Sequence, residues 1–568
     1  MPTEDLLDAL DPEQRAVATS FGHPVCVLAG AGTGKTRALT YRIGYGIASA
    51  EYSPNRVLAL TFTTRAAGEL RSRLAELDAS AAQVRTFHSA ALAQLNFFWP
   101  QVAGGSAPKV LDGKARTIAD AAMRLRFTVD VATARDVAAL IEWRKVRMLG
   151  MADLARDFAE GGRQAPGRLS VEQTMALLEG YEQLNGERKQ IDFEDVLLLT
   201  AGMLIDEPQI ADQVREQYRH FLVDEYQDVS PIQHELLQLW LGERRDLCVV
   251  GDASQTIYRF AGASANYLLD FADHYDGAEV ITLDRNYRSS PQIVQRANDL
   301  MRGKPGAITL LPQQPESAEP TRTAFANDVA EADGVAREIA AAIAGGVSPD
   351  DIAVLMRVNA QSAGLERALR DAGVGYRVRG GVPFFDRPEI RQALMQLRAE
   401  ALSDTGTRPF FQIVNDVLWS LGWSTEAPGT AGAVRDRWES LNVLAELADA
   451  APERTTLADF VEQLRTQADH GTEPALGAVT LATIHSVKGL EWDHVWLIGA
   501  SEGLLPISYA KTADAIDEER RLCYVAITRA RQSLRVSWAR MGARGEQAPS
   551  RFLAESGMHS SDAGAPAH

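Results

Sequence analysis

Residues 27–40 read VLAGAGTGKTRALT, an apolar run followed by three closely spaced glycines and a Lys-Thr pair. This order predicts a strand, a glycine-rich turn and a helix, a layout that directs backbone N–H groups and a helix N-terminus toward one point. A phosphate chain suits that point, with Lys35 as a mobile cation and Thr36 as an oxygen ligand for Mg²⁺. The usual spelling of such a loop has glycine where this chain has Ala29. A glycine-rich turn that binds no nucleotide therefore stays open as the alternative.

Two blocks of the chain alternate short β-branched runs with helical patterns, which predicts an α/β fold with parallel sheets. Each run ends in a polar cluster, and such sheets collect ligand-binding residues at the carboxyl ends of their strands. The runs are PVCVLA (24–29), VLALTF (57–62), HFLVDE (220–225) and LCVVGD (247–252), then DIAVLM (351–356), AVTLAT (478–483), HVWLIG (494–499) and LRVSW (534–538). Helical patterns with few strand signals interrupt the blocks at 93–197 and 396–476. We expect two nucleotide-fold cores, each with a mainly helical insertion.

The bulk composition restricts the class of protein. The net charge of -18 argues against a protein that coats nucleic acid indiscriminately, although it leaves room for a narrow basic channel. No apolar run has membrane-spanning length and the N-terminus is acidic, so we expect a cytoplasmic location. Cys26, Cys248 and Cys523 are far apart within apolar segments, which favours small core residues over a zinc site or disulfides.

A pair of acids follows the third apolar run, in FLVDEYQD at 221–228. In a nucleotide enzyme, Asp224 would hold Mg²⁺ and Glu225 would orient or deprotonate the attacking water. Acids at a strand end also serve as helix caps or lie in solvated turns. The preceding glycine-rich turn favours the catalytic interpretation.

The segment VVGDASQTIYRFAGA at 249–263 combines an amide with two aromatic rings. Gln255 is placed to contact a γ-phosphate or its water. Tyr258 and Phe260 are two residues apart, so on an extended segment they would face the same side and form a base-stacking platform. Two half-buried core rings are the alternative.

Two cation-bearing segments lie far from the glycine-rich turn, LDRNYRSS at 283–290 and EERRLCYVAITRAR at 518–531. Phosphoryl transfer gains from an arginine that reaches the departing phosphate. If Arg288 and Arg529 belong to the second core and Lys35 to the first, the nucleotide would lie between them and hydrolysis would open and close that cleft. Taken singly, each arginine would more often form a surface ion pair, which contributes little to stability.

Together these segments resemble the UvrD/Rep/PcrA group of superfamily 1A DNA helicases over nearly the whole chain. The matching motifs, in order, are LDPEQRAV, AGAGTGKT, LTFTTRAAGEL, VRTFHS, IDFEDVLLL, VDEYQDVS, VGDASQTIYRFAGA, LDRNYRSS, IAVLMRVNAQS, GGVPFFDRPEI, TIHSVKGLEWDHVWL, EERRLCYVAITRAR and PSRFL. The resemblance implies two RecA-like cores with parallel sheets. The expected parts are a first core (1–92 and 198–285), a helical insertion (93–197), a second core (286–395 and 477–554), a short helical insertion (396–476) and a disordered tail (555–568).

The resemblance also implies roles for individual residues, with ATP and Mg²⁺ as ligands. Gln14 would read the adenine edge, Arg37 and Tyr287 would pack on the base, and Glu491 would meet the ribose. The glycine-rich turn would hold the phosphates through Ala29, Gly30, Ala31, Gly32, Thr33, Gly34, Lys35 and Thr36. Asp224, Glu225 and Gln255 would serve Mg²⁺ and water, and Arg288 and Arg529 would act as paired arginine fingers. The strand-binding residues would be Phe62, Thr63, Arg65, His88, Phe193, Tyr258, Phe260, Arg357, Asn359 and His485.

Several positions depart from the family pattern. Thr64-Arg65 replaces Asn-Lys, and Phe260-Ala261 replaces the more usual Trp-Arg, so stacking area and one cation are lost. His485, outside its motif, would more often be a buried histidine. The second insertion is shorter than in familiar members of the group, so its regulatory role is not carried over.

The resemblance implies an ATP-driven motor that moves 3′ to 5′ on single-stranded DNA and unwinds duplex, in DNA repair or replication restart. Its expected partners are single-stranded DNA, single-strand/duplex junctions and a DNA-repair protein, and it would be a monomer or weak dimer. One alternative is a translocase that displaces proteins and needs a partner to unwind. Another is a nucleotide-dependent switch or scaffold. The residues that argue against it are the intact Lys35, Glu225, Gln255, Arg288 and Arg529.

Overall fold

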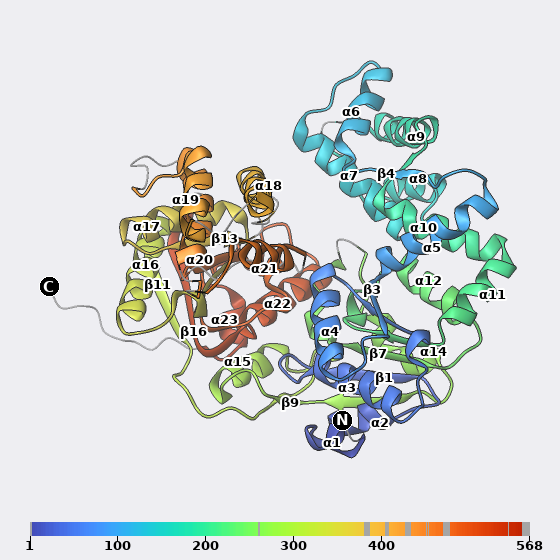
Figure 1. Cartoon of the computed structure of the whole chain (residues 1–568), viewed down its shortest axis with the longest axis horizontal. Coiled ribbons are helices and arrows are strands. Elements are labelled where there is room, and N and C mark those ends of the chain that lie inside the picture. The colour runs from blue at the N-terminus through green and yellow to red at the C-terminus, as the bar shows by residue number, and fades with distance from the viewer. Residues whose placement is uncertain are drawn as a thin grey trace. The chain divides into compact units, whose positions relative to one another are not determined.

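The computed structural model describes residues 3–167, 169–259, 262–379, 385, 387–403, 408–426, 433–449, 451–452, 454–469, 477–542 and 545–558. The chain forms two compact units (Figure 1). The first comprises Met1–Tyr287 and Met301–Gln313, and the second Arg288–Leu300 and Gln314–His568. Each unit is built around its own parallel sheet, which confirms the predicted α/β class.

The first unit contains a six-stranded parallel sheet in the order β3-β2-β6-β7-β1-β8. Its strands are β1 (Val25–Ala29), β2 (Val57–Thr61), β3 (Gln83–Thr86), β6 (His220–Val223), β7 (Leu247–Gly251) and β8 (Glu279–Leu283). Alternate side chains enter separate cores: Val25 and Val27 pack on one face, whereas Cys26 joins the other. Helices cover both faces, which explains why the strands read as continuous apolar runs.

Helices of the first unit contribute to these two cores. One core holds side chains from α2 (Pro12–Thr19), α3 (Lys35–Ala48) and α4 (Thr64–Glu76). The other holds side chains from α5 (Phe87–Val102), α10 (Phe193–Asp206), α11 (Pro208–Gln217), α12 (Pro231–Leu241), α13 (Asn266–Leu269) and α14 (Phe271–His274). The N-terminal α1 (Thr3–Asp8) packs against α3.

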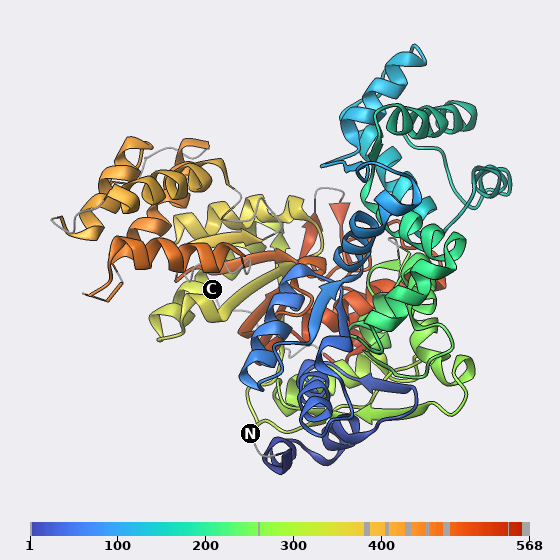
Figure 2. The same cartoon turned by 45° about the vertical axis from the view of Figure 1, so that its right-hand side comes forward.

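The first helical insertion has a small core of its own, built from residues such as Ile118, Val137, Leu177 and Leu184. Its elements are α6 (Ala115–Arg124), α7 (Val131–Val146), α8 (Met151–Ala159), α9 (Val171–Glu187) and the short paired strands β4 (Lys109–Val110) and β5 (Gln190–Ile191). Figures 1 and 2 show α6 and α9 standing apart from the sheet that carries β1 and β7. The long α5 and α10 connect this insertion to the sheet, and they pack against each other.

The second unit contains a parallel sheet in the order β11-β16-β15-β12-β14-β13, with β17 antiparallel to β16. The strands are β11 (Thr321–Asn327), β12 (Ile352–Met356), β13 (Tyr376–Arg379), β14 (Val479–Thr483), β15 (Trp492–Leu497), β16 (Ala530–Gly542) and β17 (Gly545–Glu546). Its helices are α15 (Pro291–Met301), α16 (Asp328–Ala344), α17 (Ser362–Asp371), α22 (Ala513–Ile527) and α23 (Arg551–Glu555).

Where the structure describes the second helical insertion, it has four helices around a separate core that includes Leu397, Val414, Leu441 and Phe460. Its helices are α18 (Pro388–Ser403), α19 (Phe410–Ser420), α20 (Ala433–Asp449) and α21 (Leu457–Asp469). Among the helices in the described ranges, none combines the length and apolar character that crossing a membrane requires.

Several parts of the chain differ from expectation. Residues 388–395, predicted as part of the second core, begin α18, and Ile390 and Ala393 pack in the core of the second insertion. Residues 301–313, predicted as part of the second core, belong to the first unit. Their β10 (Leu311–Pro312) pairs with β9 (Arg285–Asn286), and Leu310 is 1% exposed beside Gly30. The predicted disordered tail is also wrong at its start, because Ser556 and Met558 are buried. The rest of that tail, 559–568, lies outside the described residues.

Candidate functional site

The glycine-rich turn joins β1 to α3 and needs glycine at two positions. Gly32 has φ of 70° and Gly34 has φ of 80°, in the left-handed region that side chains with Cβ disfavour. Gly34 is the N-cap of α3, so Lys35 and Thr36 form the first helical positions. A Cβ at Gly30 would come within 2.2 Å of Leu310 Cδ2, so a side chain there would displace the Leu310 side chain. The backbone is therefore bare where a phosphate would approach.

Four successive carbonyl groups of this turn accept hydrogen bonds from the protein. The pairs are Gly30 O from Thr33 Oγ1 (2.9 Å), Ala31 O from Asn286 Nδ2 (2.7 Å), Gly32 O from the Tyr287 N–H (2.9 Å) and Thr33 O from Gln14 Nε2 (3.0 Å). In a trans peptide the N–H points opposite to the C=O. Each N–H of residues 31–34 is thus turned away from a satisfied carbonyl, an arrangement that fits an anion beside the helix N-terminus.

The residues predicted to hold the adenine surround the same turn. Gln14 is buried on α2 and donates to the turn itself. The Tyr287 hydroxyl donates to Asp11 at 2.7 Å, and Arg37 donates to the Ala9 carbonyl at 2.7 Å. Sequence reasoning missed Asn286, whose amide holds the turn. In its motif, roles at the nucleotide were predicted only for the neighbouring Tyr287 and Arg288.

The predicted acids lie where β6 ends, beside the strand that precedes Gln255. Glu225 has φ of 53°, an uncommon conformation for a residue with a side chain, and its N–H donates to Asp224 Oδ1 at 2.9 Å. The Gln227 amide donates to the Glu225 carboxylate, while its oxygen accepts the Asp252 N–H at 2.9 Å. A chain of contacts therefore connects the ends of β6 and β7.

Asp252, at the end of β7, extends this chain toward the glycine-rich turn. Gln255 donates to its carboxylate at 2.7 Å. Burial raises the pKa of the Asp252 carboxyl, and the nearby Lys35 ammonium opposes that rise. Since β6, β7 and β1 are neighbours in the sheet, Glu225, Gln255 and Lys35 lie along one edge. Asp252 was not among the predicted site residues, although its place at the end of LCVVGD was a usable signal.

Four of the rings predicted to bind the strand form two stacked pairs in the first unit. Phe62 and Tyr258 have ring centroids 5.6 Å apart and planes within 16°, and His88 and Phe193 are at 3.9 Å and 10°. Phe62 is 38% exposed and Phe193 52% exposed, so each pair presents a ring to solvent. Tyr258 itself is half-buried, so a stacking platform and a half-buried core ring both remain open for it. Phe260 lies outside the described residues.

Two further predicted strand contacts, Thr63 and Arg65, follow Phe62 in the sequence. Thr63 caps α4 by accepting the Ala66 N–H at 3.1 Å, so its hydroxyl already has a structural task. Arg65 is exposed on the first turn of α4. Arg65 can thus offer a cation to a phosphate backbone, whereas Thr63 caps the helix that carries Arg65.

The His88 ring is neutral near pH 7, because burial and, to a lesser degree, Lys114 lower its pKa from 6.5 to about 4. As the pH falls through 6.5 the unfolded chain takes up a proton that the folded ring refuses, so stability is lost between pH 6.5 and 4. At pH 5 this effect lowers the free energy of unfolding by about 2 kcal/mol.

We predict that His88→Phe, which keeps a ring beside Phe193, reduces the acid sensitivity of the fold. The fall in melting temperature between pH 7 and pH 5 should be smaller in the variant than in the parent protein. An unchanged fall would contradict a His88 ring that stays neutral in the folded protein.

The nucleotide residues predicted in the second half converge within the second unit. Arg288 forms an ion pair with Glu491 and donates to the Thr528 carbonyl at 3.2 Å. Arg529 is 1% exposed and donates to the Leu490 carbonyl at 3.0 Å. Burial would raise the pKa of the Glu491 carboxyl, but Arg288 and Arg531 outweigh it and hold the pKa below its ordinary value. The three predicted side chains thus form one charged cluster.

Of the predicted strand contacts in the second unit, Arg357 is the one that the structure ties most firmly to protein. Its guanidinium makes a paired contact with the Glu519 carboxylate, Nη2 to Oε1 2.7 Å and Nε to Oε2 3.0 Å. Both side chains are nearly buried. Asn359 begins a short 3₁₀ turn after β12. Burial and the Arg357 charge lower the pKa of His485 to about 4, so that ring is neutral at pH 7.

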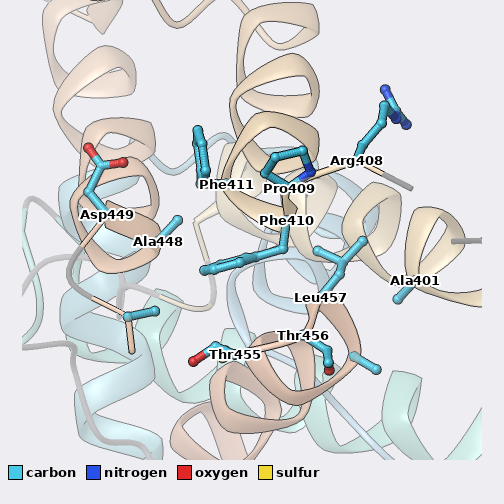
Figure 3. Close-up of a pocket in the computed structure, with 12 residues that line it drawn as sticks. Ala401, Arg408, Pro409, Phe410, Phe411, Ala448, Asp449, Thr455, Thr456 and Leu457 are labelled. Carbon is cyan, nitrogen blue, oxygen red and sulfur yellow. The ribbon is translucent and has the colours of Figure 1, made fainter. Parts of the chain in front are cut away.

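A cavity of about 830 Å³ lies in the second helical insertion, among the residues drawn in Figure 3. Phe410, Phe411, Thr455 and Thr456 line it, with Arg408 and Asp449 among its charged groups. None of the predicted nucleotide or strand residues belongs to this lining. Its mixed charge and apolar rings do not match a triphosphate site.

Comparisons with known proteins place this geometry in a family. The model of the UvrD/REP helicase N-terminal domain matches residues 10–276, and that of the UvrD-like helicase C-terminal domain matches 281–427 and 430–541. The chain therefore belongs to the UvrD-like helicases, a family of helicase enzymes.

Named relatives align over nearly its whole length. The chain is 42% identical to the ATP-dependent DNA helicase UvrD2 of Mycobacterium tuberculosis (strain ATCC 25618 / H37Rv), over 97% of this chain and 82% of that protein. It is 30% identical to UvrD1 of the same strain, over 95% and 83%. It is 29% identical to PcrA of Staphylococcus aureus (strain NCTC 8325 / PS 47), over 97% and 86%.

Proposed function

We propose that this chain is an ATP-dependent motor that moves 3′ to 5′ along single-stranded DNA and separates duplex DNA ahead of it. Its relatives are named as ATP-dependent DNA helicases, and family membership supports the same activity here. The direction of movement rests on the resemblance alone. We also propose that it acts in DNA repair or replication restart, at single-strand/duplex junctions in the cytoplasm.

One observation carries the proposal: phosphate-side groups and base-stacking rings share one edge of one sheet. Lys35, Glu225 and Gln255 follow β1, β6 and β7, while Phe62 follows the neighbouring β2. The segment after β7 belongs to both sets, because it begins at the Asp252–Gln255 contact and reaches Tyr258 only three residues later. A shift of Gln255 during the ATP cycle would therefore move a stacking ring.

The proposed roles at the nucleotide follow from the chemistry of each side chain. Lys35 and the turn N–H groups bind the phosphates, and Thr36 with Asp224 would hold Mg²⁺, which supplies charge neutralisation at the phosphates. Glu225 accepts the proton of the attacking water, positioned with Gln255. Arg288 and Arg529 are assigned to the transferred phosphate, and Gln14, Arg37, Tyr287 and Glu491 to the nucleoside.

The proposed strand track uses stacking in place of sequence reading. The pairs Phe62–Tyr258 and His88–Phe193 offer flat faces to successive bases, which suits a strand of any sequence. Arg65 would neutralise backbone phosphate. Because Arg357 is paired with Glu519, its part in strand binding requires that this pair open.

Duplexes that carry only a 3′ or only a 5′ single-stranded tail test the proposal. We expect ATP-dependent strand separation with the 3′ tail and little with the 5′ tail, together with phosphate release that rises when oligonucleotide is added. Separation only from the 5′ tail would contradict the direction. DNA-stimulated phosphate release without separation, rescued by a repair protein, would identify the partner-dependent translocase instead. Phosphate release that does not rise when oligonucleotide is added would favour the nucleotide-dependent switch instead.

A further inference from the structure

The exposed Phe193 ring stands among three carboxylates. Asp192, Glu194 and Asp195 surround it in sequence, at the N-terminus of α10. Asp192 Oδ1 accepts the Asp195 N–H and Asp195 Oδ2 accepts the Asp192 N–H, each at 3.0 Å. This capping box fixes the first turn of the helix. Unneutralised acids beside a stacking ring would repel a phosphate backbone.

Lys145, at the end of α7, binds the remaining oxygens of both capping carboxylates. Its Nζ lies 2.8 Å from Asp192 Oδ2 and 2.7 Å from Asp195 Oδ1, and 3.2 Å from Glu182. The Tyr181 hydroxyl also donates to Asp192 Oδ2, at 3.0 Å. The Lys145 side chain is only 3% exposed. It is thus placed to hold the cap of α10 and too deep to touch a strand itself.

Two other contacts support this arrangement. Lys114 neutralises Glu194 at 2.6 Å, so lysines from two other segments meet the acids around Phe193. Val146, next to Lys145, packs against Gly262, where an added Cβ would come within 2.7 Å of Val146 Cγ1. Gly262 follows Tyr258 in the loop after β7. The end of α7 therefore contacts the elements that carry both Phe193 and Tyr258.

We propose that Lys145 is a positioning residue for strand binding: it fixes and neutralises the capped N-terminus of α10, so that Phe193 stays stacked on His88 and open to a base. This inference rests on the proposed strand track. According to this inference, the buried cluster of Lys145 and its carboxylates raises DNA affinity without contacting DNA.

The test measures the oligothymidylate concentration that half-saturates both fluorescence anisotropy and ATPase stimulation. Phe193→Ala should raise it about tenfold, through the loss of one stacking contact. Lys145→Met should raise it by a similar factor. Lys109→Met, which removes a charge from an exposed lysine of the same insertion, should leave it within about twofold of the parent protein, because a single surface charge has little effect.

The decisive variant is the double substitution. If Lys145 acts through Phe193, adding Lys145→Met to Phe193→Ala should change the half-saturating concentration by less than about twofold. The inference would be overturned if the two single-variant increases in half-saturating concentration multiply in the double variant, or if Lys145→Met alone binds like the parent protein. Either outcome would leave the proposed strand track in place. A Phe193→Ala variant with unchanged binding would overturn both the track and the inference.

Removal of Lys145 leaves buried carboxylates unpaired, so thermal melting must show that the variant folds. Tyr181→Phe provides a milder route, since it removes only the hydroxyl that donates to Asp192. It should raise the half-saturating concentration about threefold, the size expected for one hydrogen bond to a charged group. That increase should vanish in the Phe193→Ala background, and its persistence there would overturn the inference.

Discussion

Replacing Lys35 by alanine should lower ATP turnover at saturating oligonucleotide by about 100- to 1,000-fold, the loss typical of removing one preorganised donor from a reacting oxyanion. Lys35 begins α3 directly after the glycine-rich turn, and its ammonium influences the Asp252 carboxyl at the end of β7. The substitution therefore removes a phosphate contact and leaves Asp252 without its stabilising cation. Phosphate release measured with and without oligonucleotide reports the loss.

Arg15→Ala is the matched control for Lys35→Ala. Arg15 lies on α2 next to Gln14, is half exposed and pairs only distantly with Asp8, at 3.9 Å. Its removal takes away one positive charge from the same unit and should leave turnover nearly unchanged. Near-normal turnover in the Lys35 variant would refute a phosphate-binding role for the turn.

Replacing Glu225 by glutamine should slow hydrolysis by about 100- to 10,000-fold while ATP binding is kept, because an amide cannot take a proton from water. The substitution is conservative in this structure. Gln227 can still donate to the remaining side-chain oxygen, and the positive φ of 53° is required of either residue. Single-turnover hydrolysis and binding of a fluorescent ATP analogue separate the two effects.

The contrasting outcome for Glu225→Gln is a loss of nucleotide affinity with a matching loss of melting temperature. That result would make Glu225 a structural support of the β6–β7 edge. Gln227→Ala offers the comparison, since Gln227 connects Glu225 to the Asp252 N–H. It should lower turnover less than Glu225→Gln, because it disturbs the orientation of the carboxylate without removing it.

The sequence predicted those parts of the molecule that depend on local order. The central strands of both sheets follow from apolar runs of strand length, whereas the edge strands β3, β8, β11 and β13 were not predicted. Lys35, Asp224 and Gln255 were found because each follows an apolar run of this kind. Parallel strands bring their carboxyl ends to one edge, so three separate motifs meet without any knowledge of the intervening chain. The buried cysteines followed equally from their apolar surroundings.

Contacts between distant segments could not be predicted in the same way. Leu310, which limits the space at Gly30, comes from a stretch that was predicted as part of the second core. Arg357 had the signature of a strand contact, yet its partner Glu519 lies 162 residues further along the chain. Lys145 sits in a helix with no motif, and only the folded insertion brings three carboxylates to it.

The backbone passes between the two compact units three times, after Tyr287, Leu300 and Gln313. As a result, α15 is covalently enclosed between two stretches of the first unit although it packs in the second, where Arg296 donates to the Gly557 carbonyl at 2.8 Å. A protease nick after Gln313 would leave α15 attached to the N-terminal fragment but still embedded in the C-terminal one. The halves are thus interlaced along the polypeptide, and neither could be inherited, lost or expressed as a simple contiguous module.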